Sequence, residues 1–418
     1  MKTSNSICIA LFIFSKIVCG ARGEDYRTDI NPALLYYQAF LLAPKDEDLQ
    51  YLNTNDWWKG WWRGERLNDE FGSGVSNTAA ELELSRQAAH QTVACDWGID
   101  LSQGPRTLLP QLARAKRTVI DSQYQIMWDL QIGNQAGARD DLLADLTLGR
   151  NISQDRTLIS VLVEMAIESF ACNEIAENIH RFSPETLQRL ADGFDAAPPR
   201  GTVAECVFPE QSMRDWYLRS IQKLKEQYPD DSEGAIDGLH KFLDYYSSED
   251  WEQLTNAAGG TVDGVAREIR DAEPLYAKLG KIMALPYSEY EGQLKYDSRP
   301  DLLKAQFEKS GNPFFIRFVS NWQRCRHREF RREVDLAMVR AAIEYKLHGE
   351  AGLKTIADPC GDGPFAFQRF VFNGADRGFE LKSTFFQARD IPEAYIFVES
   401  AGTPFNVTGI KVGQPVTE

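Results

Sequence analysis

Cysteine and histidine are scarce in this chain, and their scarcity excludes several classes of protein. Seven cysteines in 418 residues are far too few for a scaffold built on disulfides. Cys360 has no second cysteine at metal-ligand spacing, and only five histidines exist to activate a thiol or bind a metal. We therefore expect neither a metal nor a cofactor.

Positive charge is also in short supply. Lys and Arg number 46 against 61 Asp and Glu, which gives a formal charge of −15. Nucleic-acid binding needs a basic surface that neutralises phosphates, so this balance excludes a nucleic-acid partner. Attraction to an anionic membrane surface is disfavoured for the same reason. Hydrophobic residues make up 43% of the chain and charged residues 26%, as in ordinary globular proteins.

Long apolar runs are missing apart from one at the N-terminus. Lys2 precedes the run "ICIALFIFS" (7–15), which Lys16 ends before it is long enough to cross a bilayer comfortably. Two cleavage sites fit the small-residue rule: Val18/Gly20 and Ala21/Gly23. Residues 1–23 are therefore predicted to be an export signal, with a periplasmic or extracellular mature chain that does not insert into the membrane. An uncleaved N-terminal anchor is the alternative.

Cleavage would remove Cys8 and Cys19 and leave an odd number of cysteines. At least one thiol must then stay outside any disulfide. The sequence leaves open which pair, if any, is oxidised among Cys95, Cys172, Cys206, Cys325 and Cys360.

Helical signals dominate the next 330 residues. Asn31 and Pro32 form an N-cap and first-turn pair, and residues 106–132 carry apolar side chains at a period of 3.6. Residues 156–179 are apolar on nearly all sides, which indicates a central buried helix. Ser183 is the expected N-cap of another helix.

The stretch "DAAPPRG" (195–201) is the clearest break in this pattern. Two consecutive prolines cannot continue a helix, and Thr202-x-x-Glu205 is a capping box that would start the next one. Further helices are expected at about 203–228, 235–246, 248–257, 262–284, 299–309 and 313–349. The predicted regions are therefore 24–197, 198–312 and 313–418.

The pattern changes after residue 349. "FAFQRFVF" (365–372) alternates at period two, "NGADRG" turns, and "GFELKSTF" returns, which is typical of a β-hairpin. "AYIFVES" (394–400) is a candidate third strand. The predicted fold is mainly α, an irregular helical-hairpin (tetratricopeptide-like) body with a small C-terminal α+β tail that contains the hairpin. No strict repeat accompanies it.

The run "DPCGDGP" connects the last long helix to the hairpin. Prolines fix φ and glycines accept positive φ, so a structural turn is the expected role. A phosphate-binding loop would instead follow a strand and precede a helix. The turn residues are Asp358, Pro359, Gly361, Gly363 and Pro364.

Two clusters are candidate ligand contacts. "NDWWKGWWRGERL" (55–67) places four tryptophans on one broad helical side, where they form either an exposed aromatic platform or part of the core. "RCRHREFRREVD" (324–335) carries arginines that pair with carboxylates of their own helix or dock an acidic partner. The candidate contacts are Trp57, Trp58, Trp61, Trp62, Arg324, Arg328 and Arg332.

Catalytic motifs are missing: the sequence contains no HExxH, GxSxG or SxxK pattern. His90 and Cys95 are close in sequence, but a helix end with Trp97 packed inward is the simpler interpretation. A glycosidase needs only two carboxylates that the fold brings together, so the missing motifs leave an enzyme open.

Several stretches resemble a group of exported, functionally uncharacterised bacterial helical proteins. They include "NPALLYYQAFLL", "ACDWGIDLSQGPRTLLPQL", "NPFFIRFV" and "DPCGDGPFAFQRF", and they are scattered from residue 31 to about residue 385. This resemblance implies export and a helical architecture, and it implies no chemistry.

The tail is similar, more distantly, to the C-terminal region of type II secretion pseudopilins. In those proteins a helix leads into a Pro- and Gly-containing turn, here Asp358 to Phe367, and then a hairpin. Some pseudopilins bind calcium in an acidic loop after the hairpin. This chain has only Asp390 and Glu393 there, too few carboxylates for a cation that takes six to eight oxygens.

The sequence therefore predicts an exported scaffold or binding protein of the cell envelope, with an envelope protein or a glycan as partner. The alternatives are an extracytoplasmic hydrolase that uses Asp and Glu in a helical groove, and a pseudopilin-like secretion component.

Overall fold

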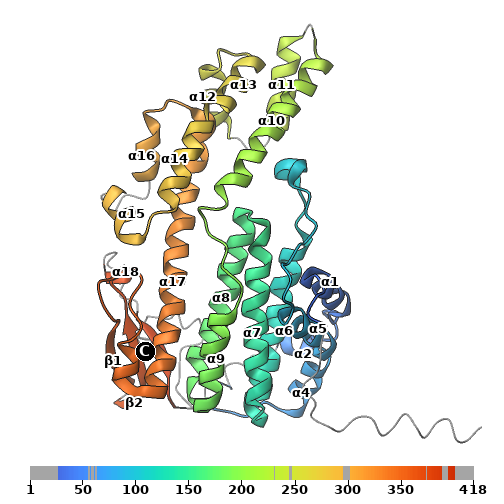
Figure 1. Cartoon of the computed structure of the whole chain (residues 1–418). Helices are drawn as coiled ribbons and strands as arrows, with labels where there is room; N and C mark the ends of the chain where they lie inside the picture. The colour runs from blue at the N-terminus through green and yellow to red at the C-terminus, as the bar shows by residue number, and fades with distance from the viewer. Residues whose placement is uncertain are drawn as a thin grey trace, which may run out of the picture.

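The computed structural model describes residues 27–54, 57, 61, 64–229, 231–243, 247–294, 302–372, 374–387 and 394–400. The predicted export signal lies outside these residues. Helices dominate the described chain and a small antiparallel sheet follows them, which confirms the predicted mainly-α body with a small β-containing tail (Figure 1). None of the described helices is long and apolar enough to span a membrane.

The first half of the chain forms a group of packed helices that we call the lower bundle. Local capping explains where several of them begin: the side chains of Asn31 and Ser183 accept hydrogen bonds from first-turn backbone N–H groups, as predicted. The helices are α1 (Pro32–Leu42), α2 (Gln50–Thr54), α4 (Asp69–Ser76), α5 (Ala79–Ala89), α6 (Pro110–Ile132), α7 (Gln135–Ile152), α8 (Leu158–Asn178) and α9 (Pro184–Ala196).

A second group, the upper helices, follows residues 197–206. The helix predicted over 262–284 is wrong in one respect, because the chain forms two helices that meet at Ala272. Pro274 lies in the first turn of the second helix, where its missing N–H costs nothing. The helices are α10 (Val207–Gln227), α11 (Ser232–Phe242), α12 (Ser248–Ala257), α13 (Val262–Asp271), α14 (Glu273–Met283), α15 (Tyr287–Leu294) and α16 (Leu302–Glu308).

The long helix α17 (Pro313–Leu353) runs along both groups and joins them (Figure 1). Its first half packs on α12, α13, α14 and α16, and its second half packs on α8 and α9. One continuous apolar core therefore includes Phe314 near its start and Ile343 near its end. Helical dihedrals break at Gly349, which has φ 67°, close to the predicted end of the helix.

The sheet packs against the second half of α17. Strands β1 (Ala366–Phe372), β2 (Ala375–Lys382) and β3 (Tyr395–Val398) are antiparallel in the order β1-β2-β3, and the short helix α18 (Thr384–Gln387) follows β2. Tyr345 of α17 contacts the rings of Phe367 and Phe379. Both the predicted hairpin and the third strand are confirmed.

The turn at residues 358–364 is organised by one buried carboxylate. Asp358 is 4% exposed and accepts hydrogen bonds from the backbone N–H of Cys360, the hydroxyl of Ser383, and both the N–H and hydroxyl of Thr384. A side chain at Gly361 would collide with this carboxylate, since its Cβ would lie 2.8 Å from Asp358 Oδ2. The turn thus fastens the end of α17 to the end of β2.

We expect Asp358→Ala to lower the free energy of unfolding by about 2–3 kcal/mol, because it leaves several buried donors without an acceptor. Chemical denaturation followed by circular dichroism measures this loss. Asp362→Ala, at an exposed position of the same turn, is the control and should change stability by less than about 0.5 kcal/mol. Equal effects of the two substitutions would contradict this role of Asp358.

Candidate functional site

Two of the four candidate tryptophans lie in the packed interior of the lower bundle. Trp61 is 5% exposed, and the guanidinium of Arg181 lies 3.9 Å from the centroid of its ring. Trp57 is partly buried against Phe71 and Tyr124, with its indole N–H donated to the Leu52 carbonyl at 2.7 Å. These two side chains follow the core-packing interpretation and form no exposed platform. Trp58 and Trp62 lie outside the described residues.

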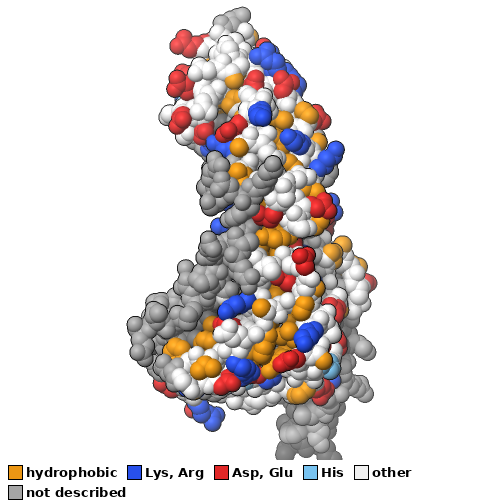
Figure 2. Space-filling view, turned by 90° about the vertical axis from the view of Figure 1, so that its left-hand side faces the viewer, with side chains coloured by type: hydrophobic (Ala, Val, Ile, Leu, Met, Phe, Trp, Pro, Cys, Tyr) orange, Lys and Arg blue, Asp and Glu red, His pale blue; other side chains and the backbone are white. Residues whose placement is uncertain are grey.

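The three candidate arginines of α17 do not share one surface. Arg324 and Arg328 are exposed, whereas Arg332 is 9% exposed and lies 3.0 Å from the carboxylate of Asp335. Figure 2 shows, on the face that carries the sheet, Lys and Arg side chains interspersed with Asp and Glu. Arg332 therefore follows the interpretation that these arginines pair with carboxylates of their own helix.

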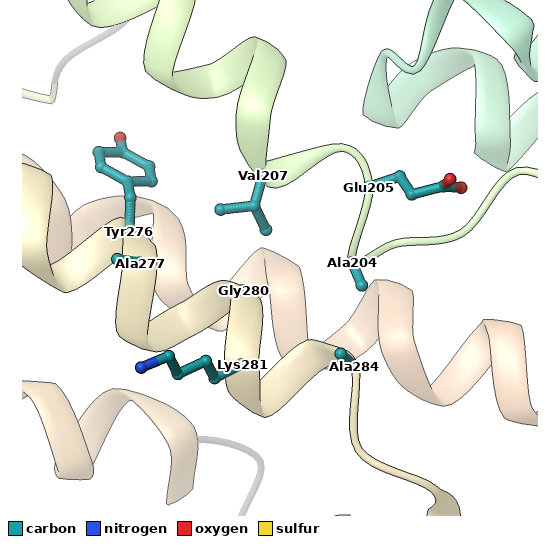
Figure 3. A pocket seen from close by; sticks show the side chains of 8 residues that line it. All are labelled: Ala204, Glu205, Val207, Tyr276, Ala277, Gly280, Lys281 and Ala284. Carbon is teal, nitrogen blue, oxygen red and sulfur yellow. The ribbon is translucent and has the colours of Figure 1, made fainter.

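An apolar groove lies between the start of α10 and helix α14 (Figure 3). We call it the α10–α14 groove, and its volume is about 440 Å³. One wall consists of Ala204, Glu205 and Val207. The other wall consists of Tyr276, Ala277, Gly280, Lys281 and Ala284.

The groove exists because α14 presents small side chains on one face. Ala277, Gly280 and Ala284 recur at helical spacing, and each leaves space that a larger side chain would fill. A Cβ built on Gly280 would lie 3.7 Å from Val207 Cγ1, in ordinary contact, so the gap between the two walls at this point is about one methyl group wide. Ala277 and Ala284 are exposed, and the groove is therefore reachable from solvent.

Among the side chains that the structure describes, two charged ones border the groove, and one of them takes part in a helix cap. The Glu205 carboxylate accepts hydrogen bonds from the N–H and hydroxyl of Thr202, while the Glu205 N–H donates to that hydroxyl. This is the predicted capping box, although α10 begins only at Val207. Lys281 forms no salt bridge with any residue that the structure describes, and its side chain runs along α14 (Figure 3).

A second feature was not foreseen from the sequence: the lower bundle contains buried carboxylates. Glu81 and Asp121 are 0% exposed, and Asp141 and Asp145 are 1% and 3% exposed. Burial raises the pKa of Glu81 to about 7, and it raises the pKa of Asp121 to about 6 and that of Asp141 to about 7. Burial also raises the pKa of Asp145 well above its usual range.

Helices α8 and α17 carry further buried carboxylates where the chain crosses from the lower bundle to the upper helices. Glu168 binds the guanidinium of Arg200 through both oxygens at 3.1 Å. Glu164 accepts a hydrogen bond from the Gly201 N–H at 3.0 Å, and its pKa is raised by burial and by the neighbouring Glu168. The apolar residues on nearly all sides of this stretch predicted a buried helix. The two glutamates at positions i and i+4 within it, Glu164 and Glu168, were a signal of buried charge that the prediction did not include.

Neither set of carboxylates provides an obvious reaction centre. The buried carboxylates lie in the packed interior, and one carboxylate among the described side chains, that of Glu205 in its cap, lines the α10–α14 groove. Within the described part of the chain, no group of three or more His, Cys, Asp or Glu side chains has a geometry that could hold a metal ion. The cysteines 95, 172, 206, 325 and 360 are buried, and no disulfide joins them.

Comparison with known proteins gives no match to a family model, a curated protein or a solved structure.

The buried carboxylates predict that the protein is more stable at pH 5 than at pH 8. The pKa of each of these carboxyl groups is higher in the folded chain than in the unfolded chain. At a pH between the two pKa values the folded chain therefore binds more protons, and the free energy of unfolding falls as the pH rises. For Glu81 the window runs from about pH 4.5 to about pH 7. The loss from this one group amounts to at most about 3 kcal/mol. Denaturant unfolding at each pH measures the total.

Glu81→Gln tests the assignment of this pH dependence. The amide stays neutral at every pH and can still accept the hydrogen bond from the Thr118 hydroxyl. The variant should therefore lose less stability between pH 5 and pH 8 than the wild type loses. Glu70→Gln, at an exposed position of α4, is the matched control. A wild-type profile that is flat over this range would contradict the prediction.

Proposed function

We propose that this chain is an exported binding protein that holds an amphiphilic anion, a molecule with an apolar body and one negatively charged group, in the α10–α14 groove. The single observation that supports this proposal most is the size and apolar lining of the groove. Its volume of about 440 Å³ falls within the range of small-molecule sites, which are also mostly apolar.

The apolar lining favours an apolar body. Ala277, Ala284 and Val207 offer carbon surface, and a ligand that covers it would remove this surface from water. Such burial contributes about 25 cal/mol per Å² of apolar surface. Gly280 lets a ligand approach the backbone of α14 closely, because it has no side chain to intervene.

The charge at the border of the groove favours an anionic group. Glu205 keeps its negative charge and accepts hydrogen bonds from Thr202 through one oxygen, whereas Lys281 is the bordering cation among the described side chains and can be neutralised by an anionic ligand. Its ammonium group has three donors on a flexible stem and can follow a headgroup of varied position. The occupant that fits best is therefore an alkyl or aromatic carboxylate rather than a cation or a neutral sugar.

The groove gives less support to the hydrolase alternative. Acid–base hydrolysis of a glycoside needs two carboxyl groups that face the same substrate. Among the described side chains, Glu205 is the one carboxylate that lines the α10–α14 groove, and one of its oxygens accepts from Thr202. An envelope-protein partner, a glycan and a pseudopilin-like role stay predictions from the sequence.

We expect one dodecanoate molecule to bind per chain, in calorimetric titrations below the concentration at which dodecanoate forms micelles. Gly280→Leu should weaken this binding at least tenfold, because the new side chain projects into the groove. Gly280→Ala is a graded control, since its Cβ makes only ordinary contact with Val207. Gly292→Leu adds the same side chain to α15, where a Cβ meets no atom within 4 Å.

Two results would contradict the proposed site. If dodecanoate does not bind the folded wild-type chain, the proposed function is wrong. Equal binding by Gly280→Leu and Gly292→Leu places the ligand elsewhere. A change from monomer to dimer on Gly280→Leu would show that the groove instead holds a second copy or a partner segment.

Lys281→Glu tests the headgroup separately. It should weaken the binding of dodecanoate about tenfold and leave the binding of dodecanol within about twofold, because only the first carries a charge next to residue 281. The same titrations measure both affinities. Equal losses for the two ligands would show that Lys281 contributes contact surface rather than charge.

A further inference from the structure

Both walls of the α10–α14 groove are attached to the same turn of α17. Val203 immediately precedes the first wall, and its backbone N–H donates to Glu329 Oε1 at 3.0 Å. Leu285 immediately follows the second wall, and its carbonyl accepts from Arg326 Nη2 at 2.8 Å. Arg326 and Glu329 in turn form a direct salt bridge, one turn apart on α17. A single ion pair therefore links the ends of both walls.

This ion pair is buried and its geometry is restrained on several sides. Glu329 is 1% exposed and Arg326 is 7% exposed. The Arg326 guanidinium lies 3.9 Å from the centroid of the Phe330 ring, and Glu333 lies 3.6 Å away on the side toward the next turn. A buried charge that loses its partner is strongly destabilising, so the two side chains hold each other in place.

The chain that leads into the first wall is fixed at three closely spaced points. Glu168 binds the Arg200 side chain, Glu164 binds the Gly201 N–H, and Glu329 binds the Val203 N–H. Directly after its helix, the second wall is attached to α17 by the bond from Arg326 to the Leu285 carbonyl, and Tyr287 packs on the Phe330 ring two residues later. Residues 326 and 329 are thus placed to control how far Ala284 lies from Ala204.

We propose that Arg326 and Glu329 are positioning residues that set the width of the α10–α14 groove and thereby select narrow ligands over broad ones. The inference rests on the proposed function for its ligand, and it concerns residues that touch the backbone beside the groove rather than the ligand itself. Loss of the pair would release the Val203 N–H and the Leu285 carbonyl and let the two walls separate, which should favour a cage-shaped carboxylate relative to a linear alkyl carboxylate.

The test compares dodecanoate with 1-adamantanecarboxylate in calorimetric titrations of the wild type and of a double variant, Arg326→Met with Glu329→Leu. Replacing a buried ion pair by apolar side chains of similar volume is often neutral or stabilising, so the variant is designed to fold. It keeps the packing but cannot hold either backbone group. We expect the affinity ratio of the linear to the cage-shaped ligand to fall at least tenfold.

Glu329→Gln provides a second variant, in which Glu333 is the carboxylate that remains near Arg326. Its amide oxygen can still accept from Val203, while the charge that holds Arg326 is lost, so the ratio should fall by less than in the double variant. Arg270→Met, at an exposed position of α13, is the control. A role confined to stability would lower the unfolding midpoint and leave the affinity ratio unchanged, and this result would overturn the proposal.

A measurement without ligand tests the positioning role of Arg326 and Glu329 independently of the proposed binding function. Amide hydrogen exchange is followed by mass spectrometry in peptides that cover residues 202–207 and 283–287. We expect both peptides to exchange at least tenfold faster in the double variant, with no change elsewhere in α10 or α14. If the wild type binds neither carboxylate, the proposed function fails and this exchange result alone decides the positioning role. Unchanged exchange in both peptides would overturn it.

Discussion

The arrangement of the molecule depends on how the chain crosses from the lower bundle to the upper helices. Pro198 and Pro199 prevent a helix at this point, so the buried backbone N–H groups that follow have no helical acceptor. The carboxylates of Glu164 and Glu329 accept from Gly201 and Val203 instead. The passage is narrow, since a Cβ on Gly201 would lie 2.6 Å from the Ser153 Cβ. The charges in the core thus compensate for a stretch without secondary structure.

This crossing explains why a groove opens just above it. A helix that began directly after the prolines could pack against α14 along its whole length. The chain instead forms the capped turn at 202–205, and α10 starts only at Val207. The wall opposite α14 is therefore a short turn with the small residue Ala204, and the α14 face that it leaves uncovered includes two alanines and a glycine.

Local signals in the sequence were sufficient to predict the fold class and several helix starts. The caps at Asn31 and Ser183 and the alternation of 365–372 depend on residues a few positions apart, and each is present in the structure. The break between α13 and α14 was missed because apolar residues continue at helical spacing across Ala272. Pro274 marked it, since proline is favoured in the first turn of a helix.

The candidate site was harder to predict, because its walls are about 70 residues apart in the chain and most of the side chains that line them are small and apolar. The sequence instead suggested tryptophans and arginines as ligand contacts. The structure places Trp61 and Arg332 in the interior. The polar residues that matter to the groove lie beside it: Arg326 and Glu329 belong to the arginine-rich stretch of α17. Their effect reaches the groove through backbone hydrogen bonds, and such bonds cannot be inferred from residue type.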